Sequence, residues 1–299
     1  LVLNISNPTN ATVGTASATG TILDESNDPL NPAANTEGDK PTVSVSDASA
    51  IEGNNLVHTV TVNGSTEAAV TYPFSLTNGT ATEGVDYDGN PATDIIFSGG
   101  VTYNSATSTI TVPAGITSFT VTYPTTDDGI DEDNETTTVT IGNESGTGTI
   151  EDNDAAPVIN ITATDSTAIE GVAGDSIIFT VNQTGSSDKD TIVTVKLDLP
   201  VGTGGAVAAD ILNQQVVYNN TDGIPTTYTV AQLIAGIDIT IPAGATTSPT
   251  FSITPTNDTN YEVSETLGMS ISNPVNATVG TASATGTILD ESNDPLNPT

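Results

Sequence analysis

Carboxylates are the side chains of this sequence that are both numerous and clustered. The 299 residues include 37 Asp and Glu against 3 Lys and Arg, which gives a formal net charge of −34. Oxygen-rich groups of this kind bind hard divalent cations, because Ca²⁺ takes about six to eight oxygen ligands and tolerates irregular geometry. Zinc prefers nitrogen and sulfur ligands, and the chain has no Cys and a single His. The composition therefore points to calcium, with a solvated acidic surface as the alternative.

The acids gather in short segments that lie between stretches rich in alternating apolar residues. Such segments include 127–135, 151–154 and 257–265. In an up-and-down β topology, alternate loops lie at the same end of a sandwich, so we expect these segments to converge. Two unit charges about 4 Å apart repel by roughly 1 kcal/mol in water and about 4 kcal/mol at an effective dielectric of 20. A cation between the loops would remove this repulsion.

Short runs that alternate apolar residues with Thr or Ser predict the strands that position these loops. A hydrophobic content of 35% with only 13% charged residues argues against disorder. The predicted strands are 42–46, 57–62, 69–75, 108–112, 118–123 and 136–141 in the first half, and 158–163, 176–181, 191–197, 237–241, 250–254, 266–272 and 282–288 in the second. About seven short strands per roughly 110–135 residues favour an all-β fold of antiparallel sandwiches.

One segment favours a helix. Thr229 and Gln232 have the spacing of a capping box, and Gly236 can end a helix over 231–235. A strand followed by a loop is the alternative.

Internal repeats define the domain organisation. Residues 10–32 are identical to residues 276–298, and Ile-Glu-Gly at 51–53 recurs at 169–171. We therefore expect a pair of homologous domains from a long tandem array. The expected parts are 1–30 as terminal strands of a preceding repeat plus linker, 40–154 as the first domain, 155–292 as a longer second domain with an insertion around 200–236, and 293–299 as linker. Segment 24–41 also reads as a polar linker.

The ordered motifs of both halves resemble the Calx-β domain. The first half has Ala50-Ile51-Glu52-Gly53, then GTATEGVDY at 79–87, Asp127-Asp128 with Glu132 and Glu135, and GTIEDND at 148–154. The second half has Ala168-Ile169-Glu170-Gly171, Asn257-Asp258 with Glu262 and Glu265, and GTILD at 286–290. It departs at 202–210, which has no Asp-Tyr, so the resemblance leaves the role of Asp210 open.

This resemblance implies tandem immunoglobulin-like sandwiches with calcium at one end. The implied metal ligands are Glu52, Asp86, Asp127, Asp128, Glu132, Asp152, Asp154, Glu170, Asp258, Glu262 and Asp290. Glu135 and Glu265 also match, but can instead point along the strand that follows.

Tandem Calx-β arrays with near-identical repeats resemble the extender regions of giant RTX-type bacterial surface adhesins. The resemblance implies an extracellular, cell-surface, calcium-stiffened stalk or fibre in adhesion and biofilm, whose partners are neighbouring repeats. A chain this acidic repels nucleic acid and anionic lipid, and no apolar run is long enough for a membrane span.

Two other functions fit the same residues. Strand signals within 1–30 could pair with another chain, as in a self-assembling extracellular filament or surface layer that donates strands. The Thr-rich strands could bind carbohydrate, ice or minerals. Catalysis is not expected, because His58 reads as a strand-surface residue without a placed Ser or Asp partner, and the chain has no Trp to line a sugar cleft.

Overall fold

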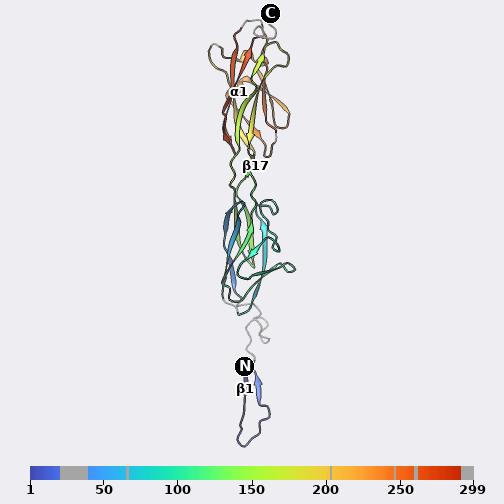
Figure 1. The fold of residues 1–299 in the computed structure, drawn as a ribbon, viewed down its shortest axis with the longest axis vertical. Coiled ribbons are helices and arrows are strands. Elements are labelled where there is room, and N and C mark those ends of the chain that lie inside the picture. The colour runs from blue at the N-terminus through green and yellow to red at the C-terminus, as the bar shows by residue number, and fades with distance from the viewer. Residues whose placement is uncertain (21–39, 65–66, 203, 246, 259–261, 291–299) are drawn as a thin grey trace. The chain divides into compact units, whose positions relative to one another are not determined.

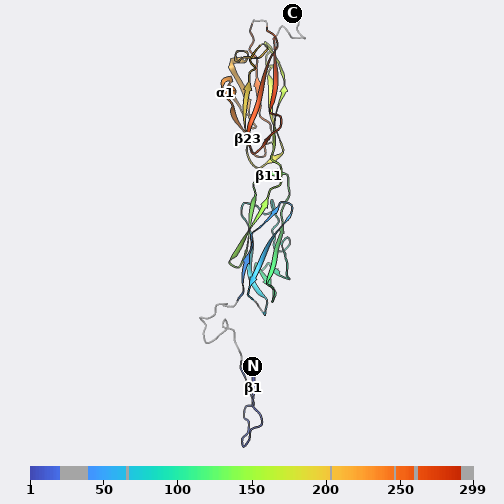
Figure 2. The ribbon, with the colours of Figure 1, turned by 90° about the vertical axis from the view of Figure 1, so that its left-hand side faces the viewer.

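The computed structural model describes residues 1–299 except 21–39, 65–66, 203, 246, 259–261 and 291–299. The fold is all-β, with two tandem sandwiches, one short α-helix and two 3-10 turns, η3 (Ala208–Asp210) and η4 (Leu212–Gln214), among the described residues (Figures 1 and 2). This confirms the predicted fold class. No helix within the described ranges is long and apolar enough to cross a membrane.

The first sandwich consists of a four-stranded sheet in the order β3-β5-β10-β7 and a six-stranded sheet in the order β4-β13-β12-β6-β9-β8. Its strands are β3 (Thr42–Val45), β4 (Ala48–Ile51), β5 (Asn55–Asn63), β6 (Val70–Asn78), β7 (Ile96–Phe97), β8 (Thr102–Asn104), β9 (Thr109–Val112), β10 (Ser118–Pro124), β12 (Glu135–Ile141) and β13 (Glu144–Glu151). Consecutive strands β5 and β6 lie in different sheets, so the assumed up-and-down topology is wrong. Crossing between sheets lets each amphipathic sheet cover the apolar face of the other.

Buried and exposed residues alternate along β5, so every second side chain points into the first sandwich. Leu56, His58, Val60 and Val62 are buried, and the residues between them are exposed. The expectation of a strand-surface His58 is therefore wrong, since its side chain is fully buried. Its Nδ1 donates to the Ser46 carbonyl at 2.8 Å, and its Nε2 lies 3.2 Å from the Tyr123 hydroxyl. Burial lowers the pKa of His58, which keeps a neutral imidazole in the core.

The second sandwich has a six-stranded sheet in the order β20-β19-β22-β16-β14-β24 and a five-stranded sheet in the order β15-β25-β23-β18-β21. Its strands are β14 (Val158–Asp165), β15 (Thr167–Ile169), β16 (Ile177–Thr184), β18 (Thr191–Asp198), β19 (Gln215–Asn219), β20 (Pro225–Thr229), β21 (Ile237–Ile241), β22 (Thr250–Ile253), β23 (Glu265–Val275), β24 (Thr278–Val279) and β25 (Ser283–Leu289). Pairing is antiparallel except at the edges, where β14–β24 and β15–β25 are parallel.

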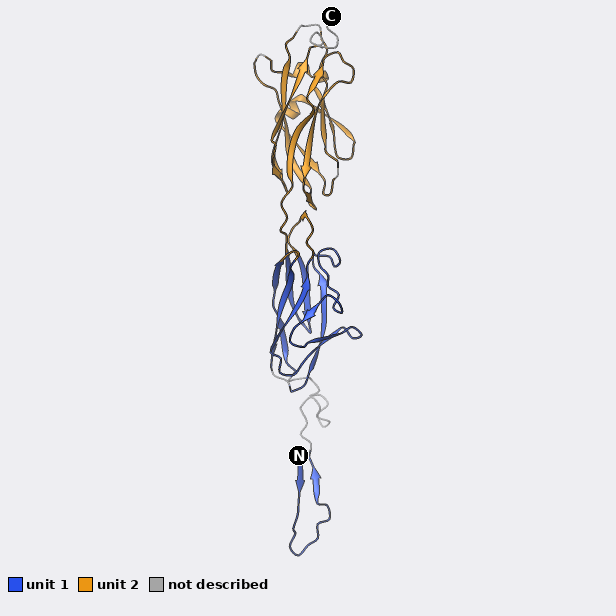
Figure 3. Cartoon of the chain, in the orientation of Figure 1, with its two compact units in different colours: residues 1–50, 54–125, 136–150 blue, residues 51–53, 126–135, 151–299 orange. Residues whose placement is uncertain are grey.

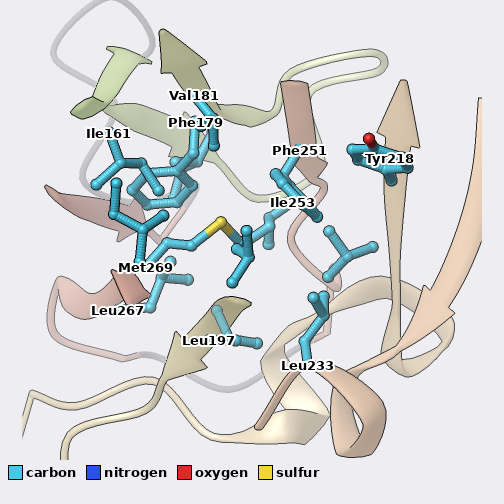
Figure 4. Packing of buried hydrophobic residues seen from close by; sticks show 14 of the residues in the cluster. Ile161, Phe179, Val181, Leu197, Tyr218, Leu233, Phe251, Ile253, Leu267 and Met269 are labelled. Atoms are coloured by element: carbon cyan, nitrogen blue, oxygen red, sulfur yellow. The ribbon is translucent and has the colours of Figure 1, made fainter. Parts of the chain in front are cut away.

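The predicted helix is confirmed as α1 (Val230–Ala235). Thr229 caps it by accepting a hydrogen bond from the Gln232 backbone N–H, and Gly236 ends it with a φ of 95°. Leu233 is fully buried and joins the core of the second sandwich (Figure 4). The same core contains Met269 from β23, which packs among aliphatic and aromatic side chains of both sheets.

The chain forms two compact units, and each consists of segments that are not continuous in the sequence (Figure 3). One unit comprises 1–50, 54–125 and 136–150, and the other comprises 51–53, 126–135 and 151–299. The acidic loop 126–135 thus belongs to the second unit, where β11 (Ile130–Asp131) pairs in parallel with β17 (Ser186–Ser187).

Residues 1–20 form a two-stranded hairpin of β1 (Val2–Asn4) and β2 (Ser17–Thr19). The predicted linkers lie largely outside the described residues, since 21–39 and 291–299 are not described.

Candidate metal centre

Glu52 is held at the end of β4 by backbone contacts. Its N–H donates to the carbonyl of Glu151 at 3.0 Å, so the start of segment 151–154 lies beside it. Gly53 follows with a φ of 74°. A Cβ on Gly53 would lie 2.7 Å from the Cβ of Asp127, so only glycine allows the two loops to approach this closely. Residues far apart in sequence therefore meet here, as predicted.

Three carboxylates form a cluster in this region. Glu52, Asp128 and Asp154 offer oxygens that all lie within 4.8 Å of one another. Glu52 is only 7% exposed. Asn153 lies among them, and its Nδ2 donates to Glu52 Oε1 at 3.3 Å and to Asp127 Oδ1 at 3.4 Å. The Oδ2 atom of Asp154 is buried and has no hydrogen-bond partner, which leaves one oxygen of this carboxylate unsatisfied.

Electrostatics confirm that this cluster is crowded with negative charge. The pKa of Glu52 is raised to about 7, first by burial, then by its hydrogen bond and charge repulsion with Asp154, and by the charges of Asp152 and Asp128. Burial and neighbouring negative charges both disfavour the charged form of a carboxyl group. A divalent cation would offset that negative charge.

The remaining predicted residues of the first half lie in the same loops or in the first unit. Asp152 donates its N–H to Asn134 Oδ1 at 3.2 Å, and its Oδ1 accepts from the Asp154 N–H at 3.5 Å. Glu132 is half-buried in loop 126–135. Asp86 belongs to the first unit, where its Oδ2 accepts from the Thr82 N–H at 2.6 Å.

The second sandwich repeats this backbone scaffold. Glu170 donates its N–H to the Leu289 carbonyl at 2.9 Å. A Cβ on Gly171 would lie 2.9 Å from Asn257 Oδ1, so Asn257 occupies the place that Asp127 takes in the first half. Glu170 and Asp290 are each 3% exposed.

Glu262 joins two groups of acids in the second sandwich. Its N–H donates to Asp290 Oδ2 at 3.1 Å, and its carboxylate clusters with those of Asp210 and Glu265, with oxygens within 4.8 Å of one another. Asp258 is exposed beside Asn257.

Asp210 and Glu265 are the residues that sequence reasoning left open. Asp210 lies in the 200–236 insertion, so its spacing matches no motif and only its acidic character could have marked it. The carboxylate of Glu265 turns toward Asp210, and its buried Oε2 has no hydrogen-bond partner. The pKa of Glu265 is raised to about 7 by burial, then by its hydrogen bond and charge repulsion with Asp210, and by Glu262 and Glu170.

Both clusters fit a hard divalent cation. Their donors are carboxylate oxygens, each cluster has a buried oxygen without a partner, and each has a carboxyl group whose pKa is about 7. Which of the predicted residues ligate a metal stays a prediction.

Comparison with protein families identifies both halves of the chain. The Calx-beta domain model matches residues 37–165 and again residues 173–292. The chain belongs to the Calx-beta domain family. The predicted tandem of Calx-beta domains is thereby confirmed.

The solved structures to which this chain is similar have low sequence identity to it. CBD12 from CALX1.2 is 13% identical, with 82% of this chain and 98% of that chain covered and a TM-score of 0.30. The calcium binding domain CBD12 of CALX1.1 is 12% identical, with 83% and 99% covered and a TM-score of 0.32. The Escherichia coli adhesin FdeC is 10% identical, with 85% and 64% covered and a TM-score of 0.27. A search of curated proteins gave no match.

Proposed function

We propose that this chain is a calcium-stiffened structural repeat of a long extracellular protein, serving as an extender or stalk of a cell-surface adhesin or fibre. The observation that carries the proposal is the cluster of Glu52, Asp128 and Asp154, with its unsatisfied buried oxygen. Asp154 lies in the segment that follows β13 in the sequence. Asp154 is four residues before Val158, the first residue of β14.

Bound calcium would neutralise these carboxylates and bridge them. Glu52 would hold it from the turn after β4, Asp128 from loop 126–135, and Asp154 from the connecting segment. Linking the three would fix the start of segment 151–157 and thereby restrict motion between successive domains. Repeated along an array, the same restriction would produce a rod rather than a flexible string.

The far end of loop 126–135 already has contacts of its own in the second unit. Ser187 Oγ donates to the Asp131 carbonyl at 2.9 Å and to Asp131 Oδ2 at 3.1 Å. Lys189 Nζ lies 3.4 Å from carboxylate oxygens of both Asp131 and Asp133. The single positive charge of Lys189 partly offsets the charge of Asp131 and Asp133, which distinguishes these two acids from Asp127 and Asp128. The loop is thus held at one end by protein groups, and we propose that calcium holds the other.

The proposed function requires an extracellular setting, and the acidic sites fit one. Calcium sites of extracellular modules need an affinity of only about 10⁻⁴–10⁻³ M, and sites made of loops and exposed acids such as Asp258 suit that range. Internal repeats with 23 identical residues support a tandem array as the parent protein. Protease treatment of intact cells that make the parent protein tests the location, since an intracellular protein would be protected.

A calcium titration of the 299-residue chain tests the mechanism. Excess chelator should lower the melting temperature, because the unfolded chain lacks the site, and should make the chain more flexible in small-angle scattering. Magnesium at the same concentration serves as the control, since it demands stricter octahedral geometry. Melting and scattering that do not change between calcium and chelator would refute calcium stiffening.

A further inference from the structure

Hairpin 1–20 has the register of the last strands of the second Calx-beta domain. Leu3 pairs with Ala18 in the hairpin, and Met269 pairs with Ala284 between β23 and β25. The adjoining pairs also correspond, as does the backbone bond from Ile5 N to Ala16 O, at 2.9 Å, which recurs from 271 to 282 at 2.8 Å. The sequences around them are also the same: in both copies ISNP is followed, after one residue, by NATVGTASATG.

The turn of the hairpin has the same backbone conformation as its counterpart. Asn7 and Asn10 have φ values of 54° and 59°, and Asn273 and Asn276 have values of 50° and 56°. Left-handed conformation at two Asn residues in the same positions shows that the local sequence alone specifies this turn. Hairpin 1–20 therefore keeps the turn of its counterpart.

One face of the hairpin is apolar and open. Leu1, Leu3 and Ile5 are 85%, 69% and 58% exposed. Their counterparts 267, 269 and 271 are 0%, 0% and 4% exposed, because they pack into the core of the second sandwich (Figure 4). Alternation places the three exposed side chains on one side of the strand, so the hairpin presents a face that is built to be covered.

Two glycines show what covers it. Gly14 and Gly20 have open space where a Cβ would be, and neither has a positive φ. At the counterpart of Gly20, a Cβ on Gly286 would lie 2.6 Å from Ile177 Cγ2 in β16; at the counterpart of Gly14, a Cβ on Gly280 would collide with Asn160 Oδ1 in β14. Nothing within the hairpin requires glycine at these positions, whereas a sandwich body containing β14 and β16 does.

We propose that hairpin 1–20 is a closing strand pair, and that it docks onto a sandwich body with the sequence of residues 155–264 that lacks its own closing pair. β1 takes the place of β23 beside β18 in this complex. The pairing of Lys196 with residue 270 then predicts that Asn4 lies opposite Lys196 of the body. An intact second domain is not a partner, because exchanging one closing pair for another buries no additional apolar surface.

Cysteine cross-linking between copies of the 299-residue chain tests this register, since the chain has no Cys of its own. The donor carries Asn4→Cys. The acceptor carries Lys196→Cys, Leu267→Asp and Met269→Asp to displace its closing pair, and Leu3→Asp to disable its own hairpin. Opposed strand residues have Cα atoms about 4.5–5.5 Å apart, within the reach of a disulfide. After refolding together under mild oxidation, a disulfide-linked donor–acceptor pair is expected as the main product.

Three controls make the result decisive. An acceptor with Ile192→Cys in place of Lys196→Cys should give at least tenfold less linked product, because four strand residues span roughly 13 Å. In the second control, a donor that also carries Leu3→Asp should fail to link. In the third, an acceptor that keeps residues 267 and 269 unchanged should fail to link. Equal linking at 192 and 196, linking to the intact acceptor, or an acceptor that only aggregates beside the donor would each overturn the proposal.

Discussion

The two acidic sites of this chain share a scaffold but differ in their carboxylates. Glu52 and Glu170 are held by the same backbone hydrogen bond, at 3.0 and 2.9 Å, and each is followed by a glycine with positive φ. Facing that glycine is Asp127 in the first site and the neutral Asn257 in the second. The backbone arrangement has thus been kept while the charge at this position differs.

A second difference lies after the last strand of each domain. Asp152 is followed two residues later by Asp154, which belongs to the first cluster, whereas Asp290 is followed two residues later by Ser292. In the second domain, the insertion brings Asp210 beside Glu262 and Glu265 instead. The carboxylates of the two clusters come from different positions in each domain. The two sites should therefore differ in calcium affinity, and a mutation in one site should leave the other unaffected.

The largest expected effect comes from removing charge at the first site. Asp152→Asn with Asp154→Asn should abolish most of the calcium-induced stabilisation there, which mass action puts at about 2.7 kcal/mol when calcium is at 100 times its Kd. Calorimetry with and without calcium measures it. Glu144→Gln, an exposed acid at the start of β13, is the matched control. An equal loss in both domains would contradict the assignment of these residues to one site.

The pH dependence of the metal-free chain should be unusual. Glu52 and Glu265 have folded-state pKa values of about 7, raised from 4.5, so the folded state binds more protons between these values than the unfolded state does. Their contribution to stability is therefore complete below about pH 4.5 and is lost as the pH rises through 7. Denaturant melts in chelator at pH 5.5 and pH 8 should show the higher stability at pH 5.5. Saturating calcium should remove or reverse this trend, because calcium binds the deprotonated carboxylates.

Neutralising Glu265 should change the second site alone and so distinguish it from the first. Glu265→Gln removes a repulsive charge beside Asp210, so it should stabilise the metal-free second domain by about 1 kcal/mol, comparable to one net hydrogen bond, and weaken its calcium response. Thermal melts in chelator measure the first effect and isothermal titration the second. A destabilised metal-free domain would show that Glu265 has a structural role instead.

The smallest expected effect concerns Lys189. Lys189→Met breaks its ion pairs with Asp131 and Asp133, which are partly exposed and should contribute less than about 1 kcal/mol. The loss should shrink further in 1 M salt. Lys196→Met, at a more exposed ion pair with Asp198, is the control and should change stability even less.

The sequence by itself determined the elements of this protein. Alternating apolar residues specified strands such as β5, β10 and β18, since burial of one face requires a period of two. Thr229, Gln232 and Gly236 specified helix α1 through local hydrogen bonds and backbone freedom. The Asn residues of the 1–20 turn did the same, because their conformation recurs at 273 and 276. These features depend only on neighbours along the chain.

Tertiary structure decided which carboxylates meet and what they contact. Spacing alone did not show that Asp210 joins Glu262 and Glu265, or that Asp131 is occupied by Ser187 and Lys189. Nor did it show that His58, which shares the inward face of β5 with Leu56 and Val60, has hydrogen-bond partners in Ser46 and Tyr123. These outcomes depend on sheets whose strands cross over and on loops brought together from distant parts of the chain. Charge, burial and partner choice at such positions are set by contacts through space, which a local pattern does not encode.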